Sequence, residues 1–179
     1  MQFILDFLNA SMNQPIAYSN FSQSWFHYLS LLIIFVSFFY FYKTFKNNSA
    51  KNIKKVLLIF SIIMLAFEVY KQVIFTYQAN GYQWYAFPFQ FCSTPMYLFL
   101  IYSLSKNNKM DSYLISFLAT FSTFAGLAVI LYPSSVFINT IGINIQTMVH
   151  HGLMASIGMA LLLTQVKYNL KTILKGALV

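Results

Sequence analysis

Four residues able to do nucleophilic or acid–base chemistry lie inside long apolar runs of this chain. They are Glu68, Cys92, His150 and His151. Ionisable groups are costly in hydrocarbon, so they usually face a bundle interior or a cavity and mark a candidate site. Measured from the outer end of each expected span at about 1.5 Å per residue, all four lie roughly 8–14 Å deep. Three separate spans are therefore expected to bring reactive groups to one layer.

The only cysteine of the chain lies between two prolines, in the stretch AFPFQFCSTPMYLFL. Pro88 suits the first turn of a helix, and Pro95 is expected to kink that helix beside Cys92. A thiolate is favoured close to a helix N-terminus, which supports a reactive thiol. A lone buried cysteine also packs as a small hydrophobe, so both interpretations stay open.

Glu68 and Lys71 are three residues apart on one helical face. Their charges can simply neutralise each other, with the lysine side chain extending outward to the interface. A carboxylate at this depth still needs interior or aqueous surroundings, which keeps a functional role open. His27 is expected at the outer, interfacial rim of the first span.

The two adjacent histidines belong to the last predicted span. Neighbouring helical residues point about 100° apart, so one of His150 and His151 is expected to face the site. Packing of the helix with one interhelical hydrogen bond is the alternative. Gly152, Ser156 and Ala160 form a stripe of small residues that permits close helix packing. Adjacent histidines are a poor metal site, so we expect no metal and no other cofactor.

The composition indicates a polytopic membrane protein. Of the 179 residues, 59% are hydrophobic and only 8% are charged, whereas soluble domains carry about 25% charged residues. We predict one all-α domain, with an extracytoplasmic or interfacial segment at 1–24 followed by five membrane helices. The spans are expected near residues 25–45, 54–76, 87–104, 112–132 and 141–165. The last residues, KGALV, read as the start of a sixth helix that is cut short.

The net charge of +8 comes from eleven lysines and no arginine. The lysines cluster after the first, third and fifth predicted spans, which follows the positive-inside rule. This places the N-terminus outside and assigns the basic excess to topology, not to nucleic-acid binding. The wealth of Lys, Asn, Ile and Phe without Arg favours a bacterial origin and hence the cell membrane.

Three stretches together resemble the YwaF-type integral membrane proteins: FEVYKQVIF (67–75), WYAFPFQFCSTPMYL (84–98) and MVHHGLMASIGMALL (148–162). That family is similar in turn to a vertebrate membrane protein that transfers acyl chains onto ether phospholipids. The family pattern has a Glu–x–x–Lys helix, a Pro–apolar–His–apolar–Cys helix and a later helix with a histidine. Gln90 stands where the family has the first histidine, and it cannot titrate near neutral pH.

The resemblance implies a Cys/His acyl-transfer site that acts on phospholipid ester chains in the outer leaflet. Cys92 would be the nucleophile and His150 or His151 the general base. Gln90 would position polar groups or donate a hydrogen bond to an oxyanion. Glu68 would orient the donor groups of the site. A small transporter or ligand-binding subunit built on Glu68, His150 and His151 is the alternative, since transporters also use broken helices. A purely structural subunit is a third possibility. The expected partners are the bilayer and a phospholipid substrate.

Overall fold

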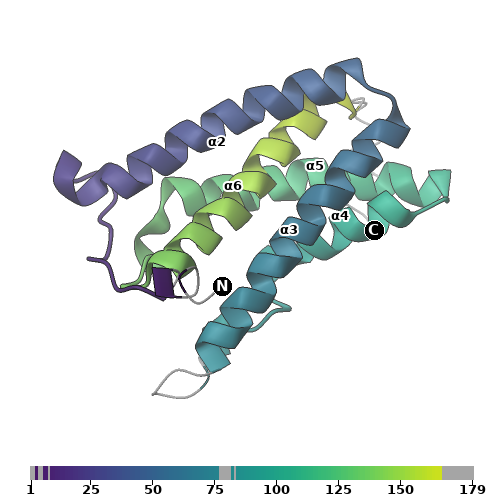
Figure 1. The fold of residues 1–179 in the computed structure, drawn as a ribbon. Coiled ribbons are helices and arrows are strands. Elements are labelled where there is room, and N and C mark those ends of the chain that lie inside the picture. The colour runs from purple at the N-terminus through teal and green to yellow at the C-terminus, as the bar shows by residue number, and fades with distance from the viewer. Residues whose placement is uncertain (1–2, 4–5, 8, 77–81, 83, 167–179) are drawn as a thin grey trace.

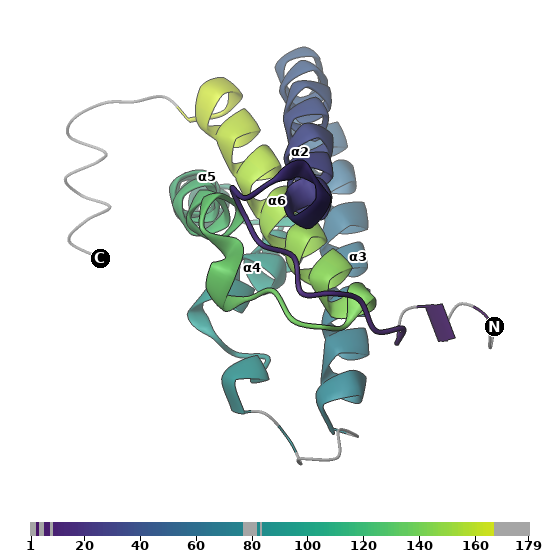
Figure 2. The same ribbon diagram turned by 90° about the vertical axis from the view of Figure 1, so that its left-hand side faces the viewer.

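Helix α6 (Ile141–Thr164) lies at the centre of the bundle and is buried along most of its length (Figures 1 and 2). The computed structural model describes residues 3, 6–7, 9–76, 82 and 84–166. Around α6 stand four further helices: α2 (Phe21–Asn47), α3 (Ala50–Thr76), α4 (Thr94–Leu104) and α5 (Asn108–Leu131). Short 3-10 turns occur at η1 (Trp84–Ala86), η2 (Phe91–Ser93) and η3 (Pro133–Ser135). Within the described residues, the predicted all-α architecture is confirmed.

Asparagines fix where two of the long helices begin. The Asn20 side chain accepts a hydrogen bond from the Gln23 amide at 3.0 Å and caps α2. The Asn107 side chain accepts from the amides of Lys109 and Met110 and caps α5. Such caps satisfy amides that have no partner inside the helix. Both helices therefore begin a few residues before the predicted spans.

Four of the five helices are long and apolar enough to cross a membrane: α2, α3, α5 and α6. Helix α4 is not, because its 11 residues span only about 16 Å. Even with the preceding turn η2, the apolar helical run covers only Phe91–Leu104. The prediction of a full third span at 87–104 is therefore wrong in its first half, which is not a continuous helix.

The prolines explain this departure. Pro95 was expected to kink a helix, but it lies in the first turn of α4, whose N-cap is Ser93. A proline lacks the amide hydrogen that would continue a helix from residue 91, whereas the first turn does not need that hydrogen. Pro88 also does not begin a helix; it lies in the turn between η1 and η2. The pair of prolines leaves the backbone around Cys92 irregular.

Helix α6 packs against α2, α3 and α5, and its small residues allow the close approach. Gly152 lies against Ile34 of α2, since a Cβ there would be 2.6 Å from Ile34 Cγ1. The Ser156 hydroxyl donates to the Ile34 carbonyl oxygen at 3.1 Å, and Ala160 is fully buried. The predicted small-residue stripe is thus a packing surface.

Each end of the bundle is closed by polar contacts. At one end Lys54 Nζ donates to Asp111 Oδ2 at 2.5 Å and to the Ser105 carbonyl at 2.8 Å, which joins the start of α3 to the α4–α5 connection. At the other end the N-terminal segment runs beside the α5–α6 connection, with the Met12 amide donating to the Asn139 carbonyl at 2.9 Å. The predicted sixth helix lies outside the described residues.

The closest approach in the core is at Gly126 of α5, and we expect Gly126→Ala to destabilise the protein. A Cβ there would lie 2.5 Å from the Ala155 nitrogen and 2.6 Å from the His151 oxygen. Backbone cannot move aside as a flexible side chain can, so α5 and α6 must separate, at a cost of about 1–3 kcal/mol. Thermal unfolding in detergent should show a lower Tm. Ala128→Val, on the exposed face of α5, is the control. An unchanged Tm for Gly126→Ala would contradict the close contact.

Candidate functional site

Both histidines of α6 are buried, and one of them was expected to face the site. His150 is 2% exposed and His151 is 8% exposed. Their contacts differ, however. His151 Nδ1 lies 2.9 Å from the Thr147 carbonyl oxygen, one turn back in its own helix. His150 instead reaches across to another part of the chain, so the structure separates two residues that the sequence left equivalent.

His150 contacts the residue that carries the thiol. Its Nε2 lies 3.2 Å from the Cys92 carbonyl oxygen. A carbonyl oxygen can only accept, so Nε2 must carry the proton in this contact. In the neutral ring Nδ1 then holds the lone pair, and this atom is buried with no hydrogen-bond partner among the described residues. His150 therefore presents a ring nitrogen that receives no hydrogen bond from the part of the chain that the structure describes.

The Cys92 thiol lies beside Gln90. Sγ is half-buried and lies 3.6 Å from Gln90 Oε1, within reach of a weak S–H···O hydrogen bond. The structure thus brings Gln90 beside the Cys92 thiol and His150 beside the Cys92 backbone, while the predicted pairing of the thiol itself with a histidine stays a prediction. The His150 imidazole contacts the Cys92 carbonyl oxygen, whereas the Cys92 thiol contacts the side-chain amide of Gln90.

Glu68 and Lys71 form an ion pair inside the bundle. Lys71 Nζ lies 2.9 Å from Glu68 Oε2, and the two side chains are 13% and 5% exposed. The Lys71 side chain is therefore largely buried. This differs from the expectation that it would extend outward to the interface. One turn along α3, Gln72 joins Glu68 to the Ala86 carbonyl in the segment that leads to Cys92. The pair therefore belongs to the same polar layer as the thiol.

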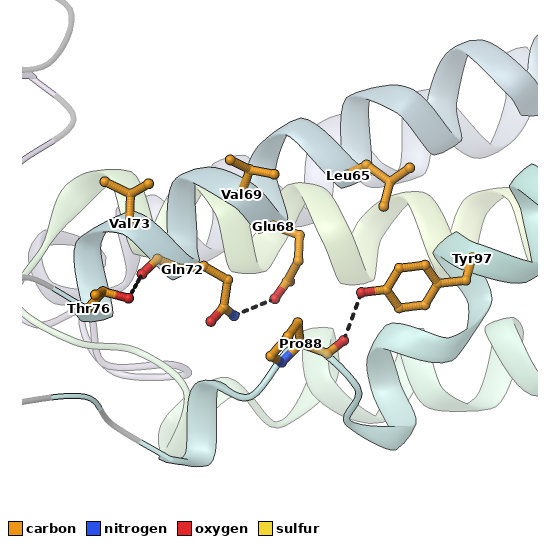
Figure 3. Close-up of a pocket in the computed structure, with 8 residues that line it drawn as sticks. All are labelled: Leu65, Glu68, Val69, Gln72, Val73, Thr76, Pro88 and Tyr97. Carbon is orange, nitrogen blue, oxygen red and sulfur yellow. Dashed lines mark hydrogen bonds between the residues drawn. The ribbon is translucent and has the colours of Figure 1, made fainter.

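Gln72, which the sequence analysis did not single out, links this ion pair to the irregular segment. Its Nε2 donates to Glu68 Oε1 at 2.7 Å and to the Ala86 carbonyl at 2.6 Å (Figure 3). Its Oε1 accepts from the Tyr82 hydroxyl at 2.7 Å. The i,i+4 spacing from Glu68 was a signal of a shared face, but the partners at residues 82 and 86 could be found only from the fold.

Three side chains from three helices hold the segment that carries Cys92. Gln72 of α3 donates to the Ala86 carbonyl, Tyr97 of α4 donates to the Pro88 carbonyl at 3.1 Å, and His150 of α6 donates to the Cys92 carbonyl. Irregular backbone at membrane depth is tolerated only where protein or a watery cavity satisfies it. The segment is therefore supported at three backbone carbonyls, and the support from α6 is at the carbonyl of Cys92 itself.

Comparison with known families decides what kind of protein carries this arrangement. The family model of the TMEM164 family matches residues 20–179, which is most of the chain. The chain belongs to the TMEM164 family. No curated protein and no solved structure matches it. Membership in this transmembrane family, together with four helices long enough to cross a bilayer, makes the chain a multi-pass membrane protein.

His27, expected at the outer, interfacial rim of the first span, is buried between helices of this TMEM164-family fold. Its side chain is 0% exposed. Its Nε2 donates to the Ile130 carbonyl oxygen at 2.8 Å, near the end of α5, and its ring packs edge-on against Tyr18 and Phe137. The residue joins α2 to α5, and it plays no part in the layer around Cys92.

The polar layer of this TMEM164-family protein offers a nucleophile, a base and a cation, but no metal-binding cluster. Among the described residues, no three His, Cys, Asp or Glu side chains are grouped as metal ligands would be. The chemistry available is thiol attack on an electrophilic carbon, proton transfer by an imidazole and stabilisation of negative charge by an ammonium or an amide.

Proposed function

We propose that this protein is a membrane-embedded enzyme that transfers acyl chains of phospholipids through Cys92. The observation that carries the proposal is the contact between His150 and the Cys92 backbone. Because that contact uses Nε2–H, the unpartnered Nδ1 remains as the proton acceptor. The resemblance to YwaF-type proteins supports the same pairing of a cysteine with a histidine.

The reaction has two steps. First, Cys92 Sγ attacks the carbonyl carbon of a lipid ester, a C–S bond forms, the ester C–O bond breaks, and the thiol proton passes through His150 to the leaving lysophospholipid oxygen. Second, the hydroxyl of an acceptor lipid attacks the thioester carbonyl carbon, a new ester C–O bond forms, the C–S bond breaks, and the hydroxyl proton passes through His150 to the cysteine sulfur. Lys71 and the Gln90 amide would stabilise negative charge on sulfur and on the carbonyl oxygen.

The proposal includes the orientation of the protein in the cell membrane. Lysines cluster where α2 ends and α3 begins (Lys43, Lys46, Lys51, Lys54 and Lys55) and around the start of α5 (Lys106 and Lys109), so the positive-inside rule favours a cytoplasmic position for these ends and an N-terminus outside. His150 then lies nine residues, or about 14 Å, from the outer end of α6. At that depth in the outer leaflet a substrate drawn from the bilayer is favoured over a soluble one.

A transport or ligand-binding site is the second candidate. The observation that favours it is the non-helical backbone between η1 and α4, next to a buried ion pair. Broken helices and buried charges are typical of transporter binding sites. This candidate needs the charges and the broken helix but not the thiol, so the two functions differ in what they require of Cys92.

Cys92→Ser is expected to reduce acyl transfer to background while the protein stays folded. Serine keeps the size and hydrogen-bonding capacity of the side chain but is a far weaker nucleophile at neutral pH. The measurement is release and transfer of a fluorescent acyl chain by protein reconstituted into phospholipid vesicles. Because the chain has a single cysteine, labelling by an activity-based thiol probe reports Cys92 alone.

The matched control is Phe91→Leu, which changes the exposed neighbouring side chain and leaves the thiol in place. It should retain both turnover and labelling. Full turnover by Cys92→Ser would reject the acyl-enzyme mechanism. Transport of a ligand by that variant would favour the second candidate.

A further inference from the structure

A groove of about 390 Å³ opens between α3 and the segment that leads into α4 (Figure 3). Its wall on α3 consists of two parallel rows of residues, each with a spacing of four. One row is polar and the other apolar: Glu68, Gln72 and Thr76, and Leu65, Val69 and Val73. Residues four apart lie above one another on a helix, so the groove has a polar edge and an apolar edge along its length.

The two edges differ in exposure. Val69 is 63% exposed and Val73 is 49% exposed on a helix that is apolar enough to cross the bilayer. Glu68, on the polar edge, is only 3% exposed. In a membrane the valines of the apolar edge face the acyl chains of neighbouring lipids, while the polar edge is buried at Glu68 and becomes exposed toward Thr76. The groove is thus open sideways to the bilayer.

The opposite wall of the groove belongs to the segment that carries the thiol. It is formed by Pro88 and Tyr97, whose hydroxyl donates to the Pro88 carbonyl. These two residues flank Cys92 in sequence. A ligand in the groove therefore contacts the helix of the ion pair and two residues that lie four and five positions from Cys92 in sequence, while Cys92 itself is not among the residues that line the groove.

We propose that this groove is the site at which a glycerophospholipid enters from the side, out of the outer leaflet. Its acyl chain lies along Leu65, Val69 and Val73, and its ester and glycerol oxygens lie along Gln72 and Thr76. An amphipathic ligand matches a groove with one edge of each kind, whereas a soluble polar ligand would leave the exposed valine edge uncovered. The inference rests on the proposed acyl transfer, because it identifies the groove as the binding site for that substrate.

Val69→Trp tests the inference. Side chains on a helix lean toward its N-terminus, so a tryptophan at 69 extends toward Leu65 and fills the apolar edge. The expected result is a kcat/KM for fluorescent phospholipid lowered about tenfold or more. Labelling of Cys92 by a small water-soluble thiol reagent should stay at the wild-type rate, which shows that the thiol and the fold are intact.

Ile62→Trp is the matched control. Ile62 lies two turns earlier on α3, is 54% exposed and does not line the groove. A tryptophan there leans away from the groove, so turnover should equal that of the wild type. Equal losses in both variants would indicate a general disturbance of α3 and would overturn the inference.

A second readout does not depend on turnover. Vesicles that contain a phospholipid with a photoactivatable acyl chain should crosslink to residues 65–73 of the wild type, and this crosslink should disappear in Val69→Trp. Absence of the crosslink in the wild type would reject the groove as a lipid site, whatever the activity. If the crosslink is present and Cys92→Ser keeps full turnover, the result supports the groove as a lipid site and rejects the acyl-enzyme mechanism.

Discussion

Replacing His150 with glutamine is expected to lower acyl transfer by about 10²–10⁴-fold, the range that a positioned general base contributes. The amide nitrogen of glutamine can occupy the place of Nε2 and keep the hydrogen bond to the Cys92 carbonyl, now 3.2 Å from the imidazole. The variant therefore retains the support of the irregular segment. It lacks only the basic Nδ1, so kcat should fall, and the rate should lose the ionisation that the histidine adds to the pH profile.

His151→Asn is the matched variant for this test. An asparagine amide lies where Nδ1 of His151 lies, so it preserves donation to the Thr147 carbonyl. Because that contact is within α6 and does not involve the thiol segment, turnover should change little. Both variants should be measured with the fluorescent phospholipid over a range of pH. A larger loss of turnover in His151→Asn than in His150→Gln would identify His151 as the general base.

The grouping of reactive residues in one layer could be predicted from the sequence because it depends only on distance along each helix. Helical rise converts residue number into depth, so Glu68 and His150 could be placed before the fold was known, whereas Cys92 lies outside a continuous helix and its place depends on the contact with His150. The packing face of α6 was also predictable, since Gly152, Ser156 and Ala160 are small and regularly spaced.

The third span could not be predicted correctly, because a proline fits both inside a kinked helix and in the first turn of a new one. The choice depends on what satisfies the backbone before Pro95. In this fold Gln72, Tyr97 and His150 do so, and none of the three is adjacent in sequence to the carbonyl that it binds. Such long-range partners leave no local pattern.

The same limit explains what the sequence left open at the histidines. A helical pattern gives the angle between His150 and His151, but the orientation of α6 relative to its neighbours decides which ring meets the backbone of Cys92. His27 was placed at the outer, interfacial rim because it lies near a helix end. Its partner, the Ile130 carbonyl, is 103 residues away in sequence and becomes visible only when α2 and α5 are side by side.

The second large effect is expected at the buried ion pair. Glu68→Gln preserves an oxygen that can accept from Gln72, so it removes the charge and little else. Lys71 is then left as a largely buried ammonium with no ionic partner, in a layer where water is scarce. Removing one member of a buried pair costs about 3–5 kcal/mol, because the remaining charge is uncompensated. Thermal unfolding should show a marked fall in Tm.

Glu68→Gln combined with Lys71→Met should recover most of that stability, because replacing both charges by neutral groups removes the desolvation cost together with the attraction. Lys51→Met, at an exposed position on the same helix, is the control and should leave Tm unchanged. If the ammonium also stabilises charge on Cys92, the double variant should fold but turn over slowly. A stable double variant with wild-type turnover would show that the ion pair has only a structural role. A double variant no more stable than Glu68→Gln would show that the uncompensated charge is not the cause of the lower Tm.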